Sequence, residues 1–200
     1  MTYRYNTLTG EYTDDRGNKV STQRISAIIE SERRFLERKI KSQTEQLIKN
    51  DATVFEWERS IQAQLKQSHL KLAALGAGGK NGITPRHRGQ LGAALRQEYN
   101  LLFDFRKDIQ AGKLSEKQIL NRARFYSRSV SQSYYRSQQL SRAMGGATLA
   151  KRELDPTAKH CPECPKYVTN GFVPIEQVVP TGTRCSCRGN CKCRVIYRLA

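Results

Sequence analysis

Long apolar segments are missing from this 200-residue sequence. No stretch approaches the ~18 apolar residues that a membrane span needs, and the opening residues, MTYRYNTLTG, contain no apolar core of a secretion signal. We therefore expect a protein made in the cytoplasm that neither crosses a membrane nor is exported by the usual route.

Apolar residues are scarce throughout the chain. They make up 38% of the sequence, below the ordinary 45–50% of globular proteins. The core is therefore modest, which excludes a large enzyme with a deep cleft built on a sheet. The length fits one domain, or one domain with a small appendage.

Acidic residues are also few. The chain has 18 Asp and Glu against 35 Lys and Arg, which gives a formal net charge of +17 and a pI near 9.9. Such an imbalance favours an anionic partner, with nucleic acid first, an acidic protein surface second and a membrane face third.

Cysteine is absent from the first 160 residues, and all six cysteines lie between residues 161 and 193. The larger part of the chain must therefore fold without them, while the tail carries a compact sulfur cluster. This contrast predicts a separate Cys-rich module over residues 160–200.

The rest of the sequence has mainly helical periodicity. Apolar residues recur every three or four positions, with turn and cap signals between the segments. We predict a mainly α fold, an elongated helical bundle or a set of helical hairpins, whose four helices cover residues 21–50, 51–75, 84–112 and 115–143. The alternating tyrosines at the start predict an N-terminal β-hairpin, and the predicted divisions are hairpin 1–20, helical body 21–145, linker 146–159 and module 160–200.

The cysteine spacing favours a zinc-knuckle-like site. A tight C-x2-C turn presents two thiolates to one ion, and a later loop folds back with two more. We predict one structural zinc held by Cys161, Cys164, Cys187 and Cys191, with Cys185 or Cys193 as the substitute ligand. Neighbours two apart on an extended chain point to opposite sides, which favours the wider pair Cys187 and Cys191. The alternatives are disulfides, or free thiols that pack as small apolar groups.

Five arginines form the clearest basic stripe, in the fourth predicted helix, where no acid follows Glu116. Tyrosines are interleaved with them, as at many nucleic-acid surfaces. We predict that this stripe contacts DNA or an acidic protein: Arg122, Arg124, Arg128, Arg136 and Arg142. The alternative is a solvated or internally paired face, with acids supplied by the other helices.

Signals of catalysis are weak. The Gly-rich segment from Gly76 to Gly82 does not have the spacing of a phosphate-binding loop, and it follows a helix rather than a strand. We interpret His69, His87 and His160 as surface or helix-capping residues. No catalytic residue is predicted, and we do not expect an enzyme.

The order of segments resembles a known family. A Tyr-rich start precedes amphipathic helices, then LGAALRQEYNLLFDFRKDIQAGKLSEKQILNRARFYS, then HCPEC and finally TGTRCSCRGNCKCRV. This pattern is similar to the small phage head morphogenesis proteins, which are related to the minor head proteins of tailed phages. One departure is the extra cysteine, because Cys185 follows Thr-Arg while Cys187 has the matching distance to Cys191.

The resemblance implies a virion protein of the head or neck, oligomeric in the particle, that associates with the portal or another capsid protein and with DNA as a further partner. It implies no catalytic activity. The competing hypotheses are a nucleic-acid-binding zinc module that acts outside any particle, and an enzyme whose site is assembled across the helices. Salt dependence separates the virion role from the nucleic-acid-binding role, because binding to DNA weakens steeply with salt.

Overall fold

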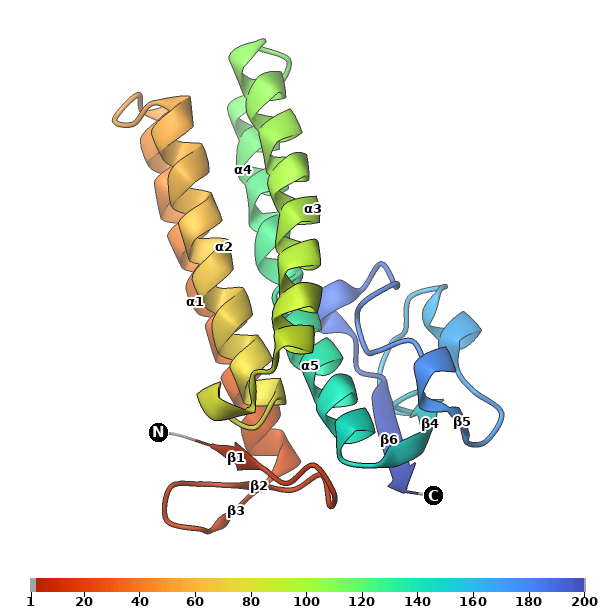
Figure 1. Ribbon diagram of the computed structural model, residues 1–200. Coiled ribbons are helices and arrows are strands. Elements are labelled where there is room, and N and C mark those ends of the chain that lie inside the picture. The colour runs from red at the N-terminus through yellow and green to blue at the C-terminus, as the bar shows by residue number, and fades with distance from the viewer. Residues whose placement is uncertain (1–2, 200) are drawn as a thin grey trace.

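Five α-helices form an elongated bundle in the computed structural model, which describes residues 3–199 (Figure 1). Their bounds are α1 Thr22–Ile48, α2 Val54–Gly76, α3 Pro85–Gln110, α4 Glu116–Phe125 and α5 Ser131–Met144. The predicted mainly α fold is confirmed. Among the described residues, none of these helices is both long enough and apolar enough to span a bilayer.

The first four helices begin at side-chain caps. The Thr84 and Ser115 hydroxyls accept hydrogen bonds from the backbone amides three residues on, and both helices have the reciprocal bond of a capping box. The cap of α2 is Thr53, where Glu56 completes a capping box, so this helix begins three residues later than predicted. His87 is the reciprocal partner of Thr84, so its predicted capping role is confirmed.

The fourth predicted helix, 115–143, is interrupted. A short 3-10 turn, Tyr126–Arg128, separates α4 from α5. Three serine hydroxyls here donate to the backbone carbonyls three residues before them, at Ser127, Ser129 and Ser131. Side-chain bonds of this kind compete with the helical ladder and bend helices, which explains the break.

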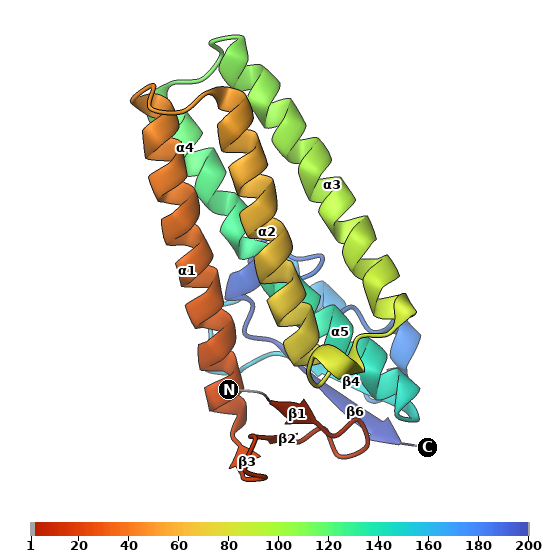
Figure 2. The ribbon, with the colours of Figure 1, turned by 60° about the vertical axis from the view of Figure 1, so that its left-hand side comes forward.

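The apolar core of the bundle lies where α1 and α2 meet α3, α4 and α5. Trp57 is buried against Phe105, with the two rings edge-to-face and their centroids 5.4 Å apart, and its indole N–H donates to the Thr44 hydroxyl. At the other end of α2, Gly76 packs against the backbone carbonyl of Tyr134, where a Cβ would collide. This contact lets α2 and α5 approach closely (Figure 2).

A three-stranded antiparallel sheet lies beneath one end of the bundle, with the order β1-β2-β3. Its strands are β1 Arg4–Tyr5, β2 Tyr12–Thr13 and β3 Lys19–Val20, so the predicted hairpin is confirmed and has one further strand. The Tyr12 hydroxyl lies 3.2 Å from both the Leu75 carbonyl and the Tyr134 hydroxyl. These bonds attach the sheet to the ends of α2 and α5.

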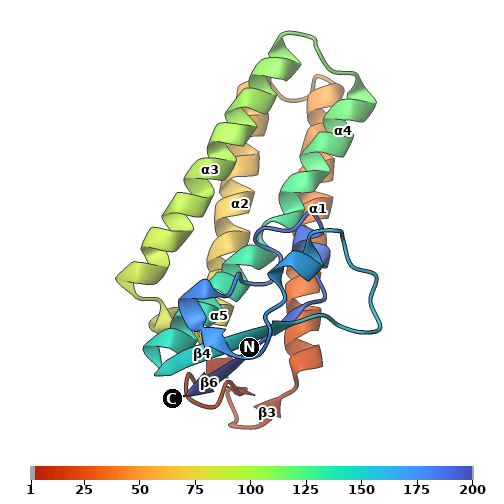
Figure 3. The ribbon, with the colours of Figure 1, turned by 90° about the vertical axis from the view of Figure 1, so that its right-hand side faces the viewer.

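The C-terminal module is built on a second antiparallel sheet, with the order β5-β4-β6 (Figure 3). The strands are β4 Ala147–Glu153, β5 Val173–Pro174 and β6 Arg194–Leu199. The predicted linker, 146–159, is therefore wrong over β4, which is the central strand of this sheet. Within the described residues, the module's apolar cluster has four buried members: Ala147, Ala150, Ile175 and Val178.

The module is docked on α5. The Gln139 side-chain amide donates to the Ile175 and Val178 carbonyls at 2.7 and 2.9 Å. Gly189 lies against the 3-10 turn, where a Cβ would stand 2.8 Å from the Arg128 carbonyl oxygen. The cysteine loops therefore rest on the bend between α4 and α5.

Candidate metal centre

All six cysteines converge on one place in the module, although they come from two separate loops. Cys161 and Cys164 belong to a tight turn after β4, closed by a hydrogen bond from the Cys164 amide to the Cys161 carbonyl. The other four lie on the segment before β6 or at its start. Glu163 joins the two loops by accepting a hydrogen bond from the Ser186 amide. None of the six forms a disulfide.

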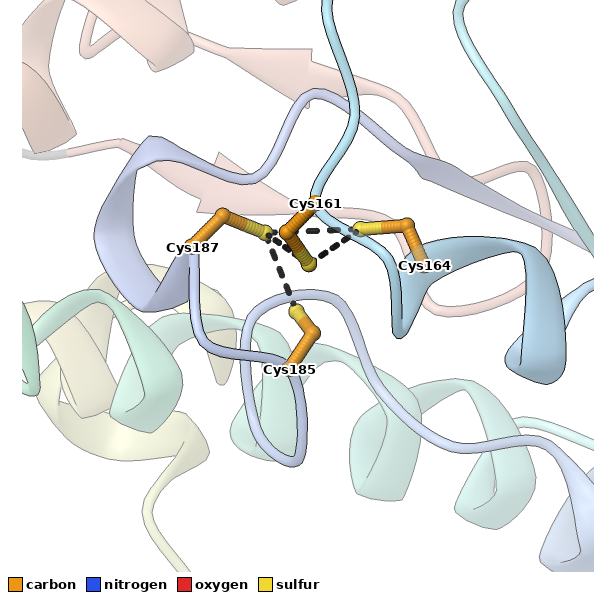
Figure 4. A group of neighbouring side chains, drawn as sticks. All are labelled: Cys161, Cys164, Cys185 and Cys187. Atoms are coloured by element: carbon orange, nitrogen blue, oxygen red, sulfur yellow. Dashed lines mark hydrogen bonds between the residues drawn. The ribbon is translucent and has the colours of Figure 1, made fainter.

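Four of the sulfurs form a tight group (Figure 4): Cys161, Cys164, Cys185 and Cys187, called the first set below. Cys164 Sγ lies 3.5 Å from Cys161 Sγ and 3.4 Å from Cys187 Sγ, and Cys187 Sγ lies 3.2 Å from Cys185 Sγ. A tetrahedral zinc with Zn–S bonds of about 2.3 Å separates its sulfurs by about 3.8 Å. The group therefore has close to the size needed to hold a metal ion.

The first set differs from the predicted ligands at one position. Cys161, Cys164 and Cys187 are brought together as predicted, but Cys185, named as a substitute, stands in the place predicted for Cys191. The prediction assumed an extended chain between Cys185 and Cys187. The chain is instead turned from residue 181 to 190, so both sulfurs face the same centre.

The remaining donors lie beside the first set. His160 Nδ1, Cys164 Sγ and Cys193 Sγ lie within 4.8 Å of one another. Cys191 Sγ is 3.8 Å from Cys164 Sγ, and both Cys191 and Cys193 are buried. His160 was interpreted from the sequence as a surface or capping residue, but it faces the sulfur cluster. Its position next to Cys161 is the sequence signal that points to this role.

A fully buried arginine lies against the sulfurs. Arg152, on β4, donates through Nη1 to the Val179 carbonyl at 2.8 Å, while Nη2 lies 3.9 Å from Cys185 Sγ and 3.7 Å from Cys191 Sγ. No carboxylate pairs with Arg152 within residues 3–199. A buried charge needs a compensating partner, and here the sulfurs are in position to supply it.

The thiols differ in acidity. Burial raises the pKa of a thiol, but at Cys161 hydrogen bonds from the Ser186 side chain and the Cys187 amide outweigh burial and lower the pKa to about 5. For Cys164 and Cys187, burial raises the pKa well above its ordinary value, and neighbouring thiols raise it further. Burial therefore favours the protonated form of these two thiols.

The predicted arginine stripe is not a single free surface. Arg122 forms an ion pair with Asp108 on α3 at 2.7 Å, and Arg124 pairs with Glu37 on α1 at 2.9 Å. The premise that no acid offsets these two charges is therefore wrong, because neighbouring helices supply the acids.

Arg142 is not at the surface. It is 5% exposed, and its Nη1 donates to the Thr7 and Leu8 carbonyls at 2.8 and 2.6 Å. Its guanidinium also lies over the Tyr197 ring, 5.5 Å from the centroid. Arg142 therefore joins α5 to the N-terminal turn and to β6.

The last two arginines of the stripe lie at the bend and just after it, Arg128 in the 3-10 turn and Arg136 in α5. Arg128 packs its guanidinium over the Phe125 ring, 4.5 Å from the centroid. Arg136 lines a cavity of about 300 Å³ between α3 and the α4–α5 pair, together with Glu98 and Arg122. Burial and the nearby Arg184 lower the pKa of Arg136, while Glu98 raises it. Within the described chain, Arg128 and Arg136 are the two arginines of the stripe that neither form an ion pair nor lie fully buried.

One buried cluster has the residue types of a hydrolase triad. His69 Nδ1 lies 2.7 Å from Ser133 Oγ, and His69 Nε2 lies 3.2 Å from Glu98 Oε2. His69 is 1% exposed, so its interpretation as a surface or capping residue is wrong. The cavity beside Ser133 measures about 10 Å³, enough for no more than one water molecule. The arrangement joins α2, α3 and α5, and a substrate has no room to reach the hydroxyl.

Comparison of the chain with protein-family models, curated proteins and solved structures finds no match. The resemblance to phage head proteins therefore rests on the sequence motifs alone.

Proposed function

We propose that this chain is a structural protein of a tailed-phage head or neck, whose helical body binds the portal or another capsid protein and whose C-terminal module is held by zinc. The main support for this proposal is the place of the phage-like sequence motifs in the structure. The segments HCPEC and TGTRCSCRGNCKCRV supply every donor atom of the candidate metal centre. The part of the sequence on which the resemblance is strongest is thus the part that forms the site.

Zinc is the metal that suits these donors best. Clustered thiolates select zinc, Cu(I) or iron–sulfur clusters, and a four-thiolate tetrahedron is the usual structural zinc site. The first set offers four protein ligands, which leaves no coordination position open for water or substrate. A closed site of this kind stabilises a fold rather than catalysing a reaction.

The small core of the module gives the metal its role. Among the described residues, the module's apolar cluster has four buried members, whereas the main core of the helices and the N-terminal sheet has seventeen. Units of this size rarely fold on apolar burial alone and use disulfides or metal ions instead. The six cysteines are free thiols, so a metal that they hold would act as the cross-link, and its binding free energy becomes folding free energy.

The contact with the partner is proposed at the bend between α4 and α5. Arg128 lies in the 3-10 turn of the bend and Arg136 lines the cavity, where the exposed side chains of Phe125 and Leu101 provide apolar area. An acidic rim of a portal protein fits this surface in charge, and the protein is oligomeric once it is in the particle. A nucleic-acid-binding module outside the particle is the competing function.

The test is purification of the tagged chain from infected host cells at several salt concentrations. A portal or capsid partner is retained in a fixed ratio through moderate salt, whereas retained DNA falls steeply as salt rises. We expect the double variant Arg128→Gln, Arg136→Gln to lose the partner protein. The matched control, Arg38→Gln with Arg59→Gln, removes the same charge from exposed positions on α1 and α2 and should retain it.

Two outcomes contradict this proposal. Retention of DNA alone, lost between low and moderate salt, favours the competing function. Equal retention of the portal protein by both double variants would show that the bend is not part of the interface. Elemental analysis of protein made under reducing conditions tests the metal: less than about half an equivalent of zinc, or the visible absorbance of an iron–sulfur cluster, contradicts a zinc site.

A further inference from the structure

The candidate metal centre has more donor atoms than one zinc can use. Six sulfurs and one imidazole nitrogen converge there, and a tetrahedral zinc takes four ligands. If the first set holds one ion, His160, Cys191 and Cys193 remain. Two of these are buried thiols, 7% and 4% exposed, and they lie next to the first set rather than elsewhere in the module.

His160 is oriented as a metal ligand. Its Nε2 lies 2.7 Å from the Asp155 carbonyl oxygen, which can only accept, so Nε2 carries the proton. In a neutral imidazole with this tautomer, the lone pair is on Nδ1, which lies 3.9 Å from Cys193 Sγ. Metal-binding histidines commonly have their second ring nitrogen bonded to a backbone carbonyl in this way.

Cys164 belongs to both groups. It is a member of the first set, and it also lies within 4.8 Å of His160 Nδ1 and Cys193 Sγ. Cys191 Sγ stands 3.8 Å from it, the spacing of two thiolates on one zinc. Cys191 is the one sulfur outside both mutually close groups, and we add it to His160, Cys164 and Cys193 to complete the second set.

We propose that the module holds two zinc ions, one in the first set and one in the second, with the Cys164 thiolate bridging them. Seven donors, one of them shared, then fill two tetrahedral sites and leave no donor unused. This inference rests on the metal-binding part of the proposed function and is independent of the phage role.

The charges agree with two ions. Two Zn²⁺ and six thiolates leave about −2 in the module, and one four-thiolate zinc alone leaves the same charge with two thiols unused. Arg152 Nη2 approaches Cys185 from the first set and Cys191 from the second, at 3.9 and 3.7 Å. The buried Arg152 guanidinium thus lies between both sites, where it offsets the charge of each.

The first experiment counts zinc per chain by native mass spectrometry and elemental analysis, on protein made under reducing conditions with added zinc. We expect two zinc ions in the natural protein. His160→Ala and Cys193→Ser should each lower the count twofold, to one, with helical circular dichroism preserved. Lys159→Ala, an exposed neighbour of His160, is the matched control and should retain two.

The second experiment tests the bridge. Replacing zinc with ¹¹³Cd should give two resonances, one typical of four sulfur ligands and one of three sulfurs and a nitrogen, coupled to each other through the shared Cys164 sulfur. In His160→Ala the second resonance should shift or disappear while the first remains.

The outcomes separate this inference from the proposed function. One zinc per chain, unchanged by His160→Ala, overturns the second site and leaves a single structural zinc. Two cadmium resonances without coupling overturn the Cys164 bridge. Absence of bound metal, in protein whose six thiols are all titratable, contradicts the zinc proposal itself.

Discussion

The bundle and the C-terminal module are stabilised by different means. The bundle, with the N-terminal sheet packed on it, buries seventeen apolar residues in one core, and these first 145 residues contain no cysteine. The module, from β4 to β6, has a four-residue apolar core and a cluster of cysteines beside it. Apolar burial grows with the size of the folded unit, so the smaller region needs a chemical cross-link where the larger one does not.

The largest effect should follow from Cys164→Ser, because Cys164 is the most central donor of the cluster. Metal binding in small zinc modules contributes on the order of 10 kcal/mol to folding. We expect loss of bound zinc and of the module's ordered amides in NMR spectra, with the helical melt of the bundle retained. If the bundle instead loses its cooperative melt, the two regions are not separately stabilised.

A substitution in the bundle core tests whether apolar burial stabilises the bundle independently of the module. Phe105 is fully buried between Trp57 and Tyr126, and Phe105→Ala should destabilise the bundle by about 4 kcal/mol. Zinc content should remain unchanged in the fraction that is folded. Phe103→Ala, two residues away and 42% exposed, is the control and should change thermal stability little.

Arg152→Leu tests the electrostatics of the module. It removes a buried charge that faces two sulfurs and donates to the Val179 carbonyl. Removing one partner of a buried charged cluster costs about 3 kcal/mol, so we expect weaker zinc retention in a competition with a chelator. Arg194→Gln, an exposed partner of Glu153 on the neighbouring strand, should cost less than about 1 kcal/mol. Equal zinc retention in both variants would show that Arg152 does not stabilise the metal-bound sulfurs.

The smallest effect should follow from a substitution of Arg142, which joins the bundle to the N-terminal turn and to β6. Arg142 joins α5 to the Thr7 and Leu8 carbonyls and lies over Tyr197. Arg142→Gln loses charge-assisted hydrogen bonds and should destabilise the chain by about 2 kcal/mol, while partner retention by the folded fraction is unchanged. If the variant instead keeps its melting temperature and loses partner binding, Arg142 belongs to the contact surface.

The helices were predictable because their signals are local. Apolar spacing and caps such as Thr84 and Ser115 lie within a few residues of each helix they define. The bend at Tyr126–Arg128 was missed because serine hydroxyls compete with the backbone in a way that apolar periodicity does not record. Strand β4 was missed because it needs β6, more than forty residues later, to pair with.

The candidate site was predictable in its cysteines but not in His160 or in its arrangement. The clustering of cysteines predicted a metal site, but Cys185, predicted as a substitute ligand, joins the tight group of four because the loop turns where an extended chain was assumed. The paired arginines Arg122 and Arg124 depend on acids from other helices, which the order of residues does not reveal. Arg152 gives no sequence signal, since its burial exists only once the sheet has formed.

Hydrogen exchange before and after chelation tests most directly the claim that metal holds the module and apolar burial holds the bundle. After a chelator removes the metal under reducing conditions, amides of β4, β6 and the cysteine loops should lose protection. Amides of α1, α2 and α3 should keep theirs, because their core contains no metal ligand. Unchanged protection throughout the module, or an equal loss in both regions, would contradict the account.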